Sequence, residues 1–101
     1  MIMTKREGTT LRVGGLGELS AVNATTFRDE TRAALDDTVT TLDIDLSTTT
    51  FLDSSGLGAL IALHKTMVSR GGSVRVVRPT PMALQVLELT RLHRVLEIIK
   101  P

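Results

Sequence analysis

The sequence contains no cysteine, no tryptophan and no tyrosine. Without cysteine the chain can form no disulfide, no thiolate metal site and no cysteine nucleophile, and this composition suits a reducing cytosol. The only aromatic residues are Phe27 and Phe51. Because single-stranded nucleic acids bind largely by stacking their bases on aromatic rings, we do not expect direct nucleic-acid binding.

The chain also lacks a strong excess of either charge and any long apolar run. Its formal net charge of +1 arises from 12 basic and 11 acidic residues spread along the sequence, so no basic stripe is present to follow a phosphate backbone. No apolar run approaches the length that crosses a bilayer. Residues 1–10 carry a basic pair but lack the apolar core of a secretory signal. We therefore expect a cytoplasmic protein without membrane insertion.

What the chain does have is enough apolar material for a core. Hydrophobic residues make up 42% of the 101 residues, which favours one folded domain over 1–101 and argues against disorder. With so few aromatic rings, this core must be built from leucine, valine, isoleucine and alanine.

Hydrophobic periodicity predicts alternating strands and helices. Alternating polar and apolar residues predict strands, and apolar residues recurring every three to four positions predict helices. The expected strands are 9–13, 42–46 and 73–77, and the expected helices are 24–39, 54–70 and 81–90. Residues 1–3 either form a short edge strand or fray, and 95–99 close the chain as a short strand or helix. Strands alternating with helices predict an α/β fold with a mixed sheet and helices on one or both of its faces.

Three minor features resemble catalytic or ligand sites but are explained more simply. The glycines of 14–17 lack the ending of a phosphate-binding loop, so we interpret them as a bulge or turn within a β-meander. Asp43 and Asp45 have the spacing of a metal pair, but strand alternation explains both carboxylates. His64 lies on the apolar stripe of a predicted helix and has no evident triad partner. We therefore predict no catalytic residue, no metal site and no cofactor.

The most informative stretch is 50–60, where the strand of 42–46 leads through a turn into a helix. The turn contains Asp53, Ser54, Ser55 and Gly56. Asp53 or a serine can cap the helix by accepting from its unpaired first amides, and the same helix end tolerates a phosphate. A nucleophile elbow requires G-x-S-x-G, which is absent here. The residues alone support a structural capping turn and a phosphorylatable switch equally.

The run Phe51-Leu52-Asp53-Ser54-Ser55-Gly56-Leu57-Gly58 closely resembles the signature of the STAS domains, the anti-sigma factor antagonists of bacteria. Other segments of the chain support this resemblance. They are Gly17-Glu18-Leu19, the strand of 42–46, Arg70-Gly71-Gly72 with the strand that follows it, and Pro81 to Leu92. The resemblance implies a STAS fold, with a mixed central sheet and about four α-helices packed against it.

The resemblance also implies a function. In the STAS family, the serine directly after the aspartate accepts a phosphate from an anti-sigma factor that is a GHKL-type serine kinase. The unphosphorylated antagonist captures this kinase and frees the sigma factor; phosphorylation breaks the complex, and a serine phosphatase resets it. The phosphorylated residue here would be Ser54, in a binding protein that is not an enzyme. The partner-binding residues implied are Asp53, Ser54, Ser55, Gly56, Leu57, Gly58, Glu18 and Ser20.

One position departs from the family pattern. Where the family commonly has an aspartate after G-E-L, near the phosphorylation site, this chain has Ser20. The same fold also serves in stressosome scaffolds and as an accessory subunit of lipid-transport ATPases. A scaffold or accessory module that no anti-sigma kinase regulates is therefore the alternative function.

Overall fold

The computed structural model describes residues 2–100. Within them the chain forms seven strands, three α-helices and one 3-10 helix. In chain order these elements are β1 (Met3–Glu7), β2 (Thr10–Gly14), β3 (Glu18–Leu19), α1 (Ala24–Ala34), β4 (Thr41–Asp45), β5 (Phe51–Leu52), α2 (Ser54–Ser69), β6 (Ser73–Val77), α3 (Pro81–Leu89), η1 (Leu92–Arg94) and β7 (Glu97–Ile99). The sequence left residues 1–3 open between an edge strand and a frayed end; Met1 lies outside the described residues, and Met3 begins β1.

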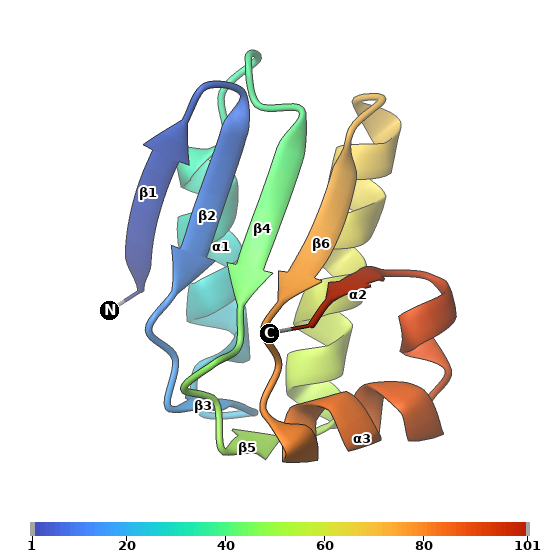
Figure 1. The fold of residues 1–101 in the computed structure, drawn as a ribbon. Helices are drawn as coiled ribbons and strands as arrows, with labels where there is room; N and C mark the ends of the chain where they lie inside the picture. The colour runs from blue at the N-terminus through green and yellow to red at the C-terminus, as the bar shows by residue number, and fades with distance from the viewer. Residues whose placement is uncertain (1, 101) are drawn as a thin grey trace.

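The predicted mixed sheet is confirmed. Five strands form one sheet in the order β1-β2-β4-β6-β7, in which β1 is antiparallel to β2 and the other pairs are parallel. Helices α1 and α2 lie side by side across one face of this sheet (Figure 1). The strands β3 and β5 form a separate parallel pair beyond the end of the large sheet. The strand-to-helix turn of 50–60 lies at this end.

Strand alternation places the core between the sheet and the two helices. Along β4, Leu42 and Ile44 are fully buried, and along β6 Val74 and Val76 are buried. Side chains of one strand face project together, so these residues share a side of the sheet. The largest fully buried residues are Phe27, Leu19, Leu42, Ile44, Leu46, Leu60, Leu63, Met67, Leu87, Leu96, Val13 and Val76.

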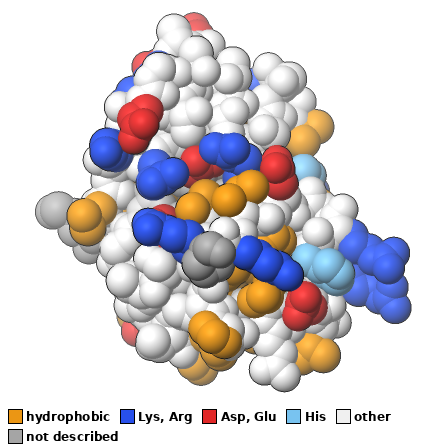
Figure 2. Space-filling model, in the orientation of Figure 1, with side chains coloured by type: hydrophobic (Ala, Val, Ile, Leu, Met, Phe, Trp, Pro, Cys, Tyr) orange, Lys and Arg blue, Asp and Glu red, His pale blue; other side chains and the backbone are white. Residues whose placement is uncertain are grey.

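The other face of the sheet carries charged residues (Figure 2). Asp43 is only 1% exposed there, because Arg75 donates two hydrogen bonds to its carboxylate, at 2.7 and 2.8 Å. Arg12 approaches the same carboxylate at 3.6 Å, and Arg78 pairs with Asp45. Both aspartates are thus matched by arginines. Residues 2–100 contain no group of three or more metal-ligating side chains.

Two helix predictions need correction. The described residues contain three α-helices instead of about four, and the short fourth helical segment is the 3-10 helix η1. Helix α1 also ends at Ala34, before the predicted end near Val39. Leu35 is already extended, and the Asp36 carboxylate accepts from the backbone N–H of Thr38 at 2.8 Å. Short acidic side chains that bond nearby backbone groups favour turns over helix, and this turn ends α1.

The glycine-rich segment of 14–17 forms a turn, as expected, but not a meander. Gly14 ends β2, and Gly15 adopts a φ of +78°, a conformation that glycine enters without strain. The strand after the turn, β3, pairs with the distant β5 and not with β2. The turn therefore directs the chain away from the large sheet and toward the start of α2.

Candidate functional site

The site is built where three segments meet: β3, β5 and the start of α2. Glu18 pairs with Phe51 and Leu19 with Leu52 in a parallel register. The backbone N–H of Asp53 also donates to the carbonyl of Leu19, at 3.3 Å. Segments more than thirty residues apart in the sequence are therefore fixed against each other directly before α2 begins.

Asp53 joins two of these segments with one carboxylate. Its Oδ1 accepts from the backbone N–H of Gly56 at 3.0 Å, which caps α2. Its Oδ2 accepts from the backbone N–H of Ala21 at 3.1 Å, in the loop before α1. These amides, Gly56 first, then Ala21 and Ser55, stabilise the charged carboxylate and lower the pKa of Asp53 below its ordinary value. Asp53 is thus the predicted cap and also a clamp between the two loops.

Gly56 is required by a close approach of two backbone segments. It is buried, and a Cβ atom added there would lie 2.1 Å from the carbonyl oxygen of Leu19. No side chain fits at that distance, so only glycine lets α2 begin directly against β3. This geometry gives the reason for one of the two glycines in the signature run.

The two serines are the exposed part of the turn. Ser54 and Ser55 are the first two residues of α2, and both are exposed to solvent. The free amides and the dipole at a helix N-terminus stabilise negative charge. A phosphate on either hydroxyl would therefore meet a favourable local field. Of the two following positions, Leu57 is half-buried and Gly58 is exposed.

Ser20 is buried, with 2% of its surface exposed. Its hydroxyl donates to Oε2 of Glu18 at 2.8 Å and accepts from the backbone N–H of Val22 at 3.2 Å. Ser20 can therefore affect a partner only through the residues that it holds. Because it orients the half-buried carboxylate of Glu18, an acidic group remains beside the turn although position 20 is not an aspartate.

Asn23 stands at the N-cap position of α1 but does not cap it with its side chain. Its Oδ1 accepts from the backbone N–H of Ser20 at 2.9 Å, and its Nδ2 donates to the carbonyl of Glu18 at 2.7 Å. The hydrogen bonds of Ser20 and Asn23 thus fold the loop of 18–23 onto itself. The loop is therefore held in one conformation beside Asp53.

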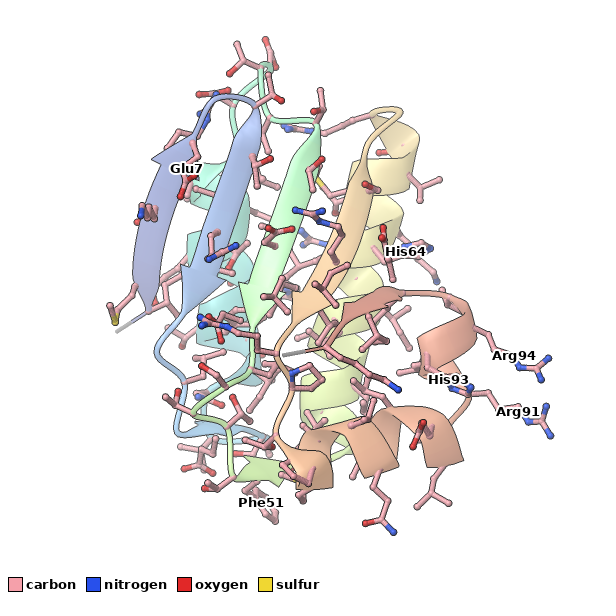
Figure 3. The ribbon with its side chains drawn as sticks, viewed as in Figure 1. Glu7, Phe51, His64, Arg91, His93 and Arg94 are labelled. Carbon is pink, nitrogen blue, oxygen red and sulfur yellow. The ribbon has the colours of Figure 1, made fainter. Side chains whose placement is uncertain are left out.

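Sequence reasoning missed two exposed apolar side chains at this site. Val22 is 82% exposed and Phe51 is 55% exposed. Phe51 projects outward at the end of the molecule where β5 lies (Figure 3). A hollow of about 520 Å³ lies beside it, bordered by Gly17, Glu18 and Asn23 among others. Aromatic side chains are enriched in the centre of protein interfaces, so Phe51 beside this hollow is a candidate contact for a partner.

No histidine lies in the turn of 53–56. His64, the one histidine on α2, is half-buried, and ten residues of helix separate it from Ser54, a rise of about 15 Å. Its Nδ1 has no hydrogen-bond partner among residues 2–100. The arrangement exposes two hydroxyls and the side chain of Phe51 beside the half-buried Glu18, whereas the Asp53 carboxylate is bonded within the molecule. None of the described helices is both long and apolar enough to span a membrane.

Comparison with known proteins places this geometry in a family. The model of the STAS domain matches residues 1–100. Among solved structures, TM1081 of Thermotoga maritima superposes with a TM-score of 0.89 at 24% identity, covering 99% of this chain and 86% of that one. An anti-sigma factor antagonist from Mycobacterium paratuberculosis gives a TM-score of 0.87 at 26% identity, covering 100% of this chain and 86% of that one.

The phosphorylated form of SpoIIAA from Bacillus has the same fold, with a TM-score of 0.74 at 20% identity over 99% of this chain and 92% of that one. No curated protein matches the sequence. The family match over nearly the full sequence agrees with the signature run at the start of α2 and with the mixed sheet behind it. The chain is a member of the STAS domain family.

Proposed function

We propose that the chain, as one STAS domain over residues 1–101, is an anti-sigma factor antagonist. It binds an anti-sigma factor that is a GHKL-type serine kinase, and phosphorylation of Ser54 by that kinase ends the complex. A serine phosphatase restores the binding form. The domain acts in the bacterial cytoplasm by binding alone, and through the sigma factor it regulates transcription.

The observation that carries the proposal is the position of Ser54. It is exposed, it is the first residue of α2, and it follows an aspartate whose side chain is fully engaged in holding the turn. A kinase can reach this hydroxyl without unfolding anything. The exposed Val22 and Phe51 beside it supply the apolar contact that a bound partner needs.

The effect of phosphorylation on binding depends on where the charge of the phosphate lies. A phosphoserine carries a charge of about −1.5 to −2 at neutral pH. At the N-terminus of α2 this charge is compatible with the fold, since the helix dipole favours it. SpoIIAA likewise keeps this fold in its phosphorylated form. The penalty falls on the partner, which must desolvate the phosphate or face it with its own acidic groups.

Intact-mass spectrometry tests the proposal. The domain is incubated with ATP and each GHKL-type serine kinase of the source genome in turn, and Ser54→Ala and Ser55→Ala are treated identically. We expect one added phosphate on the wild type and on Ser55→Ala, and none on Ser54→Ala. The kinase that adds it should bind Ser54→Ala stably and Ser54→Asp weakly.

Two results would contradict the proposal. Phosphate on Ser54→Ala but not on Ser55→Ala would move the switch to the neighbouring serine. No phosphate from any kinase, together with a stable large assembly containing the domain, would favour the scaffold or accessory function.

A further inference from the structure

A groove runs along the outer side of the helix layer, between α1 and α2. It consists of two hollows of about 350 and 430 Å³. The first hollow includes Ser55, and the second continues along α2 to Ser69. Gly58 borders both hollows and so joins them into one groove. The groove therefore begins at the proposed phosphorylation turn and extends along nearly the whole of α2.

The charged side chains of this groove have a single sign. Arg28 and Arg32 border it from α1 and Lys65 from α2, and neither hollow has an acidic residue among its lining. Arg28 is matched by Asp29, at 3.0 Å. Within the described chain, Arg32 and Lys65 form no ion pair. In a protein with a net charge of only +1, this groove is a locally cationic surface.

Gly58 is not required by the fold of the free domain. A Cβ atom added there would have no neighbour within 4 Å, and the backbone is not in a left-handed conformation. An alanine would therefore fit and would favour the helix. A glycine at an exposed helix position lets another backbone approach closely, and Gly58 offers this approach at the centre of the cationic groove.

We infer that the groove between α1 and α2 binds an acidic helix of the protein partner. The partner's glutamates or aspartates pair with Arg32 and Lys65, and its backbone passes over Gly58. The geometry is that of a helix lying in a groove, with charge complementarity selecting the partner. This inference rests on the proposed function for the partner's identity, but the charge and shape of the groove do not depend on whether that partner is a kinase of Ser54.

The test uses a synthetic amphipathic helix with glutamates along one face as the probe, titrated into the isotope-labelled domain while amide chemical shifts are followed. A second peptide with glutamine in place of every glutamate is the matched control. We expect shifts that map to the groove, and binding by the acidic peptide only. Arg32→Glu should weaken this binding by on the order of tenfold, whereas Arg94→Glu should not. Arg94 is exposed and projects from the far end of the C-terminal helical segment, away from Phe51 (Figure 3).

Each other outcome overturns the inference. Equal binding of both peptides means that apolar contact and not charge selects the occupant. An equal loss of binding in Arg94→Glu means unspecific attraction, and no binding, or shifts outside the groove, means that the groove is not a helix site. Failure of the proposed function is distinguishable, because it would leave the peptide binding intact while no kinase phosphorylates Ser54.

Discussion

Gly56 and Gly58 are two residues apart on α2, but they occupy opposite environments. Gly56 is buried against the carbonyl of Leu19, where a Cβ atom would lie at 2.1 Å. Gly58 is exposed, and a Cβ atom there would meet nothing within 4 Å. The first glycine is therefore required by the fold, and the second is free of any such requirement. The start of α2 thus has one side that is buried against the rest of the domain and one side that is exposed to a partner.

The buried side extends through the loop of 18–23 and the Asp53 carboxylate, where hydrogen bonds hold the side chains of Ser20, Asn23 and Asp53. The exposed side includes Ser54, Ser55, Phe51 and the cationic groove. A rigid support beneath an exposed hydroxyl allows a modification to change binding without changing the fold. Variants of the first side should therefore change stability, and variants of the second should change binding.

The largest effect is expected for Gly56→Ala. The added methyl group would overlap the backbone of Leu19, which cannot rotate away as a side chain could. We expect a loss of roughly 3 kcal/mol in the free energy of unfolding, at the upper end for overpacked positions. Urea denaturation followed by circular dichroism measures it. Stability equal to that of the wild type would show that β3 and α2 are not packed as described.

The hydrogen bonds of the Asp53 carboxylate should make the stability of the domain depend on pH. Because the folded-state pKa of Asp53 lies below its ordinary value of 3.8, its charged form stabilises the fold above that pH. This stabilisation is lost as the pH falls through the lowered folded-state pKa. We expect Asp53→Asn to have a lower Tm than the wild type at pH 7, and the difference to narrow below pH 3.8.

The pH experiment carries its own control. Asp36 and Asp45 also have lowered pKa values. Hydrogen bonds from Thr38 and then from Arg6 lower the pKa of Asp36. Burial would raise the pKa of Asp45, but hydrogen bonds from Ser47 and Arg78 outweigh this effect. Both remain in the variant, so both proteins should lose stability in acid. A constant difference in Tm between them across this range would contradict the clamp.

Gly58→Ala should raise the free energy of unfolding, whereas Gly56→Ala should lower it. Replacing an exposed helical glycine by alanine stabilises a helix by about 0.5–1 kcal/mol. We expect this gain in the free domain, together with weaker binding of the acidic peptide because the methyl group narrows the groove. Thermal denaturation and peptide titration of the same sample measure both. A gain in stability with unchanged peptide binding would agree with the described fold but would show that Gly58 is not part of the surface that binds the peptide.

The smallest effect on stability is expected for Ser54→Asp. A negative charge at the first position of α2 interacts favourably with the helix dipole, by roughly 0.3 kcal/mol at an exposed site. Ser54→Ala lacks that charge and is the matched control. Thermal denaturation at low and high salt should give Ser54→Asp a slightly higher Tm than Ser54→Ala, with the difference reduced by salt. A large loss of stability in Ser54→Asp would show that a charge at this position disrupts the fold of the domain and does not act on the partner alone.

Periodicity and turn chemistry predicted the three inner strands of the central sheet (β2, β4 and β6), the cap at Asp53 and the helix beginning at Pro81, because each depends on residues close together in sequence. The two edge strands, β1 and β7, were left open between a strand and another conformation. The end of α1 was predicted too late, because the turn made by Asp36 and Thr38 competes with the helix. The two-residue strands β3 and β5 are too short to show alternation. The position of Phe51 at the surface depends on this pairing. The groove depends on how α1 and α2 pack together. Neither arrangement can be predicted from residues that are close together in the sequence.

The central claim is that phosphorylation of Ser54 removes the partner without altering the domain. The most direct measurement is a calorimetric titration of the partner kinase, bound to ADP, with the unphosphorylated domain and with the domain phosphorylated at Ser54. We predict a Kd at least about tenfold weaker for the phosphorylated form, equivalent to about 1.4 kcal/mol or more. Equal affinity of the two forms would contradict the account.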